Sequence, residues 1–254
     1  MRKILIVAAS AGLLFIVAVA SAQPLPTAPR EATPDNGRCR AAVERRLAEW
    51  GGGHERYRDA DGPFGARQWR VPTHEIGTWL LLHEPVDGTP AVARVDERST
   101  TRLTFDARCH EAFTMIESSP IASVAGDVFT DSHVRALLAA QPQGVVYLWS
   151  PHMPLSVDGY RTVSDVAQRM GMSFTALRDP MSDAGYAAAL AKEAGLPASA
   201  LRTFTSIELS FRQLNLHAPA VLVFSGGHFD GLAVLGYREA AGFEAAIAGR
   251  MSGR

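Results

Sequence analysis

A continuous apolar run from Val145 to Trp149 is the feature that most constrains the fold of this chain. Such a run is typical of a strand that is buried on both faces, because neither set of its alternating side chains is polar. Helices therefore have to cover both faces of the sheet that contains it. In the next segment, five apolar residues recur at helical spacing and predict the inner face of a helix: Val157, Tyr160, Val163, Val166 and Met170.

The rest of the C-terminal half continues to alternate between strands and helices. Before the buried strand, Asp131 or Ser132 can cap a helix that runs to about Ala140. After it, the pattern predicts strands at 173–177, 221–224 and 232–237, the last two joined through Gly226 and Gly227, and helices at 184–194, 207–214 and 239–251. The predicted class is α/β, with a central mixed sheet flanked by helices.

This order of elements resembles the thioredoxin-like fold over residues 128–251, and the most specific parts are the Trp149 segment, Pro219 and the hairpin. In that family a proline in the cis form faces the active-site loop. By resemblance, Pro219 stands at the position of that proline, with Ala218 before it and Ala220 where the family usually has threonine. The sequence leaves open whether the peptide bond before Pro219 is cis.

The two active cysteines of the family are absent from this chain. Ser150 and Met153 occupy their positions in the stretch Trp149, Ser150, Pro151, His152, Met153, and residues 110–254 contain no cysteine. Thiol–disulfide exchange needs an attacking thiolate and a resolving sulfur. A thiol–disulfide oxidoreductase activity is therefore not expected, and neither is a peroxidase of the peroxiredoxin type.

The N-terminal half predicts a small α+β domain over residues 37–125. Apolar positions at helical spacing predict a helix from Arg38 to Trp50, and the glycines at 51–53 end it. Extended segments follow at 78–83, 91–95 and 102–105, separated by turn-rich pieces. We expect a helix laid on a small antiparallel sheet, and we recognise no family in this part of the chain.

Cys39 and Cys109 are the only cysteines of the chain. In an exported protein an even number of cysteines indicates a disulfide. Neither residue lies in a CxxC motif that would suggest a redox-active pair. The pattern therefore predicts a structural disulfide between the first turn of the helix and the segment just after the last strand.

The first 22 residues have the pattern of a secretory signal. A basic start is followed by an apolar run from Ile4 to Ala20 and by small residues up to Ala22. We expect cleavage after Ala22 and a periplasmic or secreted protein with no stable membrane insertion; an uncleaved N-terminal anchor is the alternative. Residues 23–36 contain four prolines and few apolar residues, which is typical of a linker.

The loop after the buried strand still carries groups that can bind a metal ion. His152 and Met153 lie in this loop, and His217 lies two residues before the proline that is expected to face it. Imidazole and thioether groups are suitable ligands for copper, in particular Cu(I). The alternative is that Met153 packs in the core and that both histidines lie at a polar rim.

Ser150 and Trp149 each have two interpretations. Ser150 could act as a nucleophile with His152, but the Gly-x-Ser-x-Gly elbow is missing and the sequence places no acidic partner. Capping of a helix that begins at Pro151 is the simpler role for Ser150. Trp149 is expected to pack beside the loop, although an exposed edge of its ring would allow it to bind a peptide.

Three hypotheses of function follow. The first is an exported, redox-inactive thioredoxin-like protein that binds a polypeptide partner or client through a groove at the degenerate loop. The residues expected to form this groove are Trp149, Ser150, Pro151, His152, Met153, Ala218 and Pro219.

The second hypothesis is copper binding or delivery through His152, Met153 and His217, and the third hypothesis is a catalyst of unknown type. The near balance of 25 basic and 26 acidic residues does not favour binding to nucleic acid.

Overall fold

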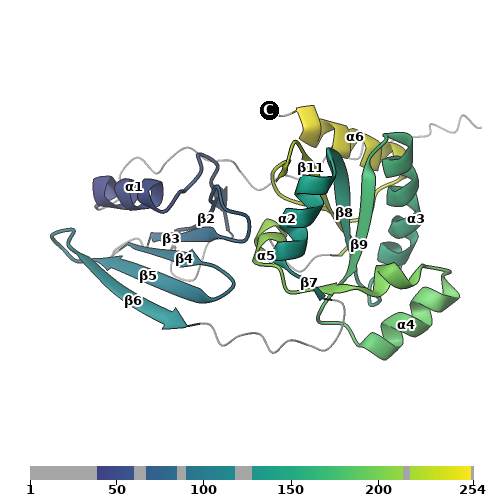
Figure 1. Cartoon of the computed structure of the whole chain (residues 1–254), viewed down its shortest axis with the longest axis horizontal. Coiled ribbons are helices and arrows are strands. Elements are labelled where there is room, and N and C mark those ends of the chain that lie inside the picture. The colour runs from purple at the N-terminus through teal and green to yellow at the C-terminus, as the bar shows by residue number, and fades with distance from the viewer. Residues whose placement is uncertain (1–38, 60–66, 85–89, 118–127, 214–217, 253–254) are drawn as a thin grey trace, which may run out of the picture.

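Two units, each built around its own sheet, lie side by side in the structure (Figure 1). The computed structural model describes residues 39–59, 67–84, 90–117, 128–213 and 218–252. The predicted signal and linker, residues 1–36, and His217 lie outside this described part. Within the described ranges, no helix is both long enough and apolar enough to cross a membrane.

The N-terminal unit is an antiparallel sheet with one helix, α1 (Arg40–Glu49), packed on one face. Each strand of this sheet pairs with the next one along the chain, which makes a meander. The buried side of α1 contributes Ala42, Val43 and Leu47 to the core of the unit. The strands are β1 (Tyr57–Arg58), β2 (Arg67–Pro72), β3 (Trp79–Glu84), β4 (Ala91–Val95), β5 (Ser99–Phe105) and β6 (Glu111–Glu117).

The disulfide expected between Cys39 and Cys109 is confirmed, with a distance of 5.3 Å between the two Cα atoms. It connects the residue before α1 to the turn between β5 and β6. The prediction that Cys109 follows the last strand was wrong, because β6 comes after it. Four of the five residues from Ala112 to Ile116 are apolar, so the sequence lacks the alternation that marks a half-buried strand. In the structure this strand carries the exposed side chains of Phe113 and Met115.

The C-terminal unit alternates between strands and helices and confirms the predicted α/β class. Its main sheet has the order β12-β11-β8-β9; β8 is parallel to β9, and β11 is antiparallel to β8, β12 and β13. A separate parallel pair joins β7 to β10. The elements are β7 (Val128–Phe129), α2 (Asp131–Ala140), β8 (Gln143–Trp149), α3 (Pro154–Arg169), β9 (Ser173–Arg178), α4 (Ala184–Glu193), the 3-10 helix η2 (Ala198–Leu201), β10 (Thr203–Phe204), α5 (Ile207–Arg212), β11 (Ala220–Ser225), β12 (His228–Phe229), β13 (Val234–Leu235) and α6 (Ala240–Ser252).

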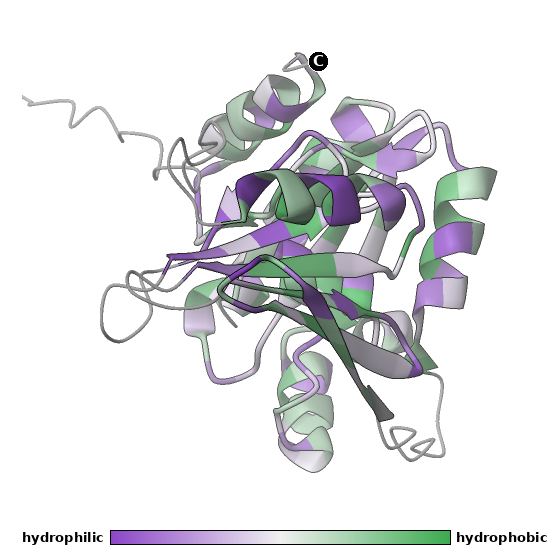
Figure 2. Ribbon diagram, turned by 90° about the vertical axis from the view of Figure 1, so that its left-hand side faces the viewer, coloured by the Kyte–Doolittle hydropathy of each residue, from purple (hydrophilic) through white to green (hydrophobic). Residues whose placement is uncertain are grey.

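Strand β8 is buried on both faces, as its apolar run predicts. On one face Val145 and Tyr147 pack with residues of α3 and α6. On the other face Val146 and Leu148 pack with residues of α2 and α5. In Figure 2, where the N-terminal unit faces the viewer, the helices show both the hydrophobic and the hydrophilic colour, as amphipathic helices do.

Two details of this unit differ from the predictions. The strand expected at 232–237 is only the two-residue β13, since β12 forms the tight hairpin with β11. The cap of α2 is Thr130, whose backbone N–H donates to Nδ1 of His133 at 3.1 Å, and neither Asp131 nor Ser132 has this role.

Asp131 instead caps the neighbouring helix α5. Its carboxylate accepts hydrogen bonds from the hydroxyl of Ser206 and from the backbone N–H groups of Ile207 and Glu208, the last two at 3.0 Å. Burial raises the pKa of Asp131, although these hydrogen bonds oppose the effect. One carboxylate thus ties the start of α2 to the start of α5.

The two units are joined through Glu208, a side chain of α5 that is 2% exposed. Its Oε2 accepts the indole N–H of Trp79 at 2.8 Å and the backbone N–H of Gly77 at 3.0 Å. Its Oε1 accepts Nε of Arg212 at 2.6 Å. The guanidinium of Arg212 lies 5.2 Å from the ring centres of both Trp79 and Phe229. The buried carboxylate therefore binds a cation from its own helix, Arg212, and two N–H donors from the N-terminal unit, those of Trp79 and Gly77.

Gly77 is the position where the chain of the N-terminal unit comes closest to these carboxylates. Its φ is +84°, and a Cβ placed there would lie 2.7 Å from the carboxylate of Asp131. Only glycine fits both this backbone conformation and this space. Helices α2 and α5 lie between the two sheets (Figure 1). Three buried side chains, Tyr57, Trp79 and Leu232, form a small hydrophobic core across the junction of the two units.

Reduction of the disulfide is expected to lower the free energy of unfolding by about 4 kcal/mol, because it releases a loop whose ends are 70 residues apart. Urea denaturation with and without a reductant measures this change. A Cys39→Ala, Cys109→Ala variant should match the reduced protein. A double variant as stable as the oxidised protein would contradict the expectation.

Glu208→Gln is expected to lower the free energy of unfolding by about 3 kcal/mol, because Arg212 then stays buried without its counter-charge. The matched control is Glu244→Gln, which breaks an ion pair with Arg169 whose two side chains are each 51% exposed. Exposed pairs of this kind contribute less than about 1 kcal/mol. Urea denaturation of the two variants compares them directly, and equal losses would show that the buried carboxylate has no special role.

Candidate functional site

The loop after β8 contains four of the residues expected to form a binding site, Ser150, Pro151, His152 and Met153. The backbone N–H of Met153 donates to the carbonyl of Ser150 at 3.1 Å and closes a turn. Helix α3 then begins at Pro154, a residue suited to the first helical position. The prediction that Ser150 caps a helix starting at Pro151 was therefore wrong, because the chain makes this extra turn first.

Ser150 bonds to Asp179 from the loop that follows β9. Its Oγ donates to Oδ2 of Asp179 at 3.1 Å. Oδ1 of the same carboxylate accepts the backbone N–H of Met181 at 2.9 Å, and the backbone N–H of Asp179 donates to the carbonyl of Trp149 at 2.7 Å. Asp179 thereby holds the two loops together, a role that the sequence analysis missed.

A signal for Asp179 was present in the sequence. It lies two residues after the strand predicted at 173–177, and β9 is parallel to β8, with Trp149 opposite Arg178. The loops that follow neighbouring parallel strands meet at one edge of the sheet. Polar residues just after both strands were therefore candidates for a contact.

The Ser150–Asp179 pair does not form a catalytic triad with the described residues. Ser150 is only 4% exposed, and no histidine of the described part of the chain has a hydrogen bond to it. His152 instead stacks on Tyr186 of α4, with ring centres 5.3 Å apart and an interplanar angle of 21°. The arrangement is suited to fixing the loops rather than to activating a nucleophile.

Trp149 and Pro219 are both buried. The indole of Trp149 is fully buried and donates to the carbonyl of Ala200 at 2.7 Å, so the predicted exposed edge is absent. The peptide bond between Ala218 and Pro219 is cis. Trp149, Asp179 and Ala218 line a cavity of only about 10 Å³. This space is about that of one water molecule and is too small for a ligand.

Large apolar side chains are exposed on the segments that follow β8 and β9. Met153 is 42% exposed, Leu155 53%, Met181 79% and Tyr186 49%. They come from three segments that the His152–Tyr186 stack and the Ser150–Asp179 bond hold together. We call these four side chains, together with His152, the loop patch; its members are therefore His152, Met153, Leu155, Met181 and Tyr186.

The described part of the chain contains two of the three residues of the predicted metal site. His152 and Met153 lie in the loop patch, while His217 is outside the described residues. Among the residues that the structure describes, no three or more His, Cys, Asp or Glu side chains are grouped so that they could hold a metal ion.

Comparison with known proteins gives no assignment: no family model, no curated protein and no solved structure matches the chain.

Asp179→Ala is expected to loosen both loops, because it removes the acceptor of Ser150 Oγ and that of the Met181 amide. Loss of these bonds should cost about 1–3 kcal/mol. Hydrogen exchange should quicken at the Met181 amide by at least about tenfold. Ser150→Ala is the control, since it leaves Oδ1 of Asp179 bonded to Met181. Unchanged exchange in Asp179→Ala would show that the carboxylate does not fix the loop.

Proposed function

We propose that this chain is an exported, redox-inactive thioredoxin-like protein that binds a polypeptide partner through the loop patch. The order of elements in the C-terminal unit supports the fold assignment, since β8 and β9 are parallel, β11 is antiparallel, and helices cover both faces. The cis bond before Pro219, at the position expected from the resemblance, supports it as well.

The observation that carries the proposal is the exposure of the loop patch. Four of the six large hydrophobic side chains that are exposed in the described part belong to it. Exposed apolar groups that gather at one place are typical of interaction sites. Two of the four are methionines, whose flexible side chains adapt to partners of different shape.

A polypeptide is a better partner for this surface than a small molecule. The cavity beside Ala218 holds about 10 Å³, so it cannot enclose a ligand. A peptide needs no such enclosure, because it can lie across an exposed surface and bury several side chains at once. The absence of cysteine from residues 110–254 leaves binding, rather than thiol chemistry, as the role of this surface.

Export is supported by the disulfide and by the sequence of the first 22 residues. A disulfide between Cys39 and Cys109 is typical of proteins in oxidising compartments. The partner would accordingly be another exported protein, or a segment of one.

The test uses a permanently unfolded polypeptide, reduced and carboxymethylated α-lactalbumin, as the probe in a surface-binding assay. A Met181→Ser, Tyr186→Ala variant should bind it at least about tenfold more weakly, because two apolar contacts are lost. Both side chains are exposed, at 79% and 49%, so the variant should fold normally.

The matched control is Phe113→Ala, Met115→Ser, which removes two apolar side chains with exposures of 56% and 68% from β6 of the other unit. It should bind the probe as the unaltered chain does. Equal loss in both variants would indicate unspecific hydrophobic binding. Unaltered binding by the loop-patch variant would refute the proposal.

A further inference from the structure

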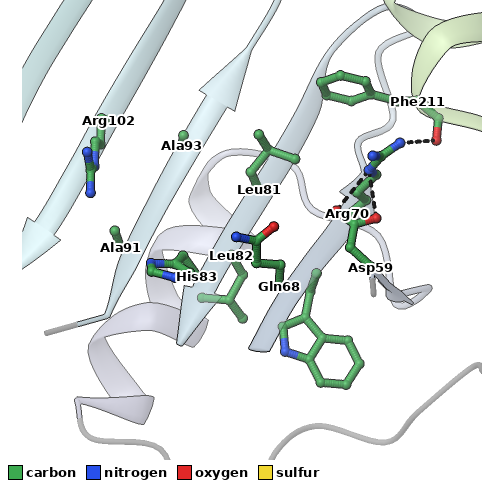
Figure 3. A pocket seen from close by; sticks show the side chains of 11 residues that line it. Asp59, Gln68, Arg70, Leu81, Leu82, His83, Ala91, Ala93, Arg102 and Phe211 are labelled. Carbon is green, nitrogen blue, oxygen red and sulfur yellow. Dashed lines mark hydrogen bonds and ion pairs between the residues drawn. The ribbon is translucent and has the colours of Figure 1, made fainter. Parts of the chain in front are cut away.

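A pocket of about 380 Å³ lies on the open face of the six-stranded sheet, opposite the face that α1 covers. The register puts two cross-strand rows of side chains on this face. One row runs from Arg70 through Leu81 and Ala93 to Arg102, and the other contains Gln68, His83 and Ala91. Figure 3 shows these side chains projecting from neighbouring strands.

The pocket is hollow because of the two alanines of β4. Ala91 and Ala93 are two residues apart, so both side chains point to the same face. The neighbouring positions carry longer side chains, Leu81 and His83 on β3 and Arg102 on β5. The alanines therefore form a low apolar floor between higher walls.

One wall of the pocket is rigid and comes from both units. Nε of Arg70 lies 2.9 and 3.0 Å from the two carboxylate oxygens of Asp59. Its Nη1 donates to the carbonyl of Phe211 in α5 at 3.2 Å, and its guanidinium lies 5.3 Å from the centre of the Phe211 ring. The bonds to Asp59 and to the carbonyl of Phe211 are drawn as dashed lines in Figure 3, and the ion pair with Asp59 neutralises the charge of Arg70.

The opposite wall carries a cation that is not neutralised. Arg102 is exposed and has no hydrogen-bond or ion-pair partner within the described ranges. Asp59 is the only acidic residue among the described residues that line the pocket, and Arg70 already neutralises it. Gln68 and His83, both partly buried, add polar groups to the lining of the pocket. The pocket thus combines an apolar floor with a net positive charge at one side.

We propose that this pocket binds a small amphiphilic anion. Its acidic group would pair with Arg102 and its apolar body would lie over Leu81, Ala91 and Ala93. The volume falls in the range of small-molecule sites, about 300–1,000 Å³, which also occur preferentially between structural units. A bare inorganic ion would leave the apolar floor of Ala91 and Ala93 without a partner. This inference is independent of the loop patch.

The test measures fluorescence titrations with two dyes, anilinonaphthalene sulfonate and its neutral relative N-phenylnaphthylamine. Arg102→Gln should weaken binding of the sulfonate at least about tenfold, because a charge-assisted hydrogen bond is lost. It should leave binding of the neutral dye unchanged. Ala93→Leu should weaken both dyes, since the longer side chain fills the floor.

Arg108→Gln is the matched control, because it removes the same charge from an exposed position in the turn between β5 and β6. All titrations are repeated in the Met181→Ser, Tyr186→Ala background, so that dye bound at the loop patch does not contribute. If Arg102→Gln and Arg108→Gln weakened binding of the sulfonate equally, the effect would be unspecific electrostatic attraction and the proposal would be overturned. Sulfonate binding unaffected by Arg102→Gln would overturn it as well. Arg102 is exposed, so this variant decides the question even if Ala93→Leu folds poorly.

Discussion

The buried carboxylate of Glu208 is the point on which the arrangement of this protein depends. A carboxylate without partners in a protein interior is very unfavourable, and here it has three: Arg212 from its own helix, and Trp79 and Gly77 from the other unit. Asp131, next to it, fixes the start of α5 in the same way. Because both units supply these groups, neither can satisfy its polar atoms alone, and the two sheets are held at one relative position.

This junction connects the two surfaces proposed to bind ligands. Helix α5 carries Glu208 at its start and Phe211 one turn later, and Phe211 forms a wall of the pocket on the open sheet. The loop patch lies in the C-terminal unit, at the edge of the sheet where β8 and β9 end. A partner at the loop patch and a small anion at the pocket would thus occupy different parts of one body.

The sequence predicted most elements well where hydrophobic spacing decides them. The ranges at 91–95 and 173–177 coincide closely with β4 and β9, and the strand at 145–149 lies within β8. Predictions about polar residues were less successful. Asp131 has the chemistry of a helix cap, as expected, but it caps α5 and not α2. Ser150 donates to Asp179 and caps no helix. In each case the partner lies far away in the chain, and local spacing carries no information about it.

The sequence by itself determined the α/β class, the burial of β8 and the pairing of Cys39 with Cys109, because hydrophobic periodicity and the presence of only two cysteines are properties of the chain alone. Only the tertiary structure decided that Glu208 is buried, that Asp179 joins two loops, and that Ala91 and Ala93 form the floor of a pocket. These features depend on which segments lie side by side. A short polar or small side chain has many compatible neighbours, and the packing of the two sheets around α2 and α5 selects one.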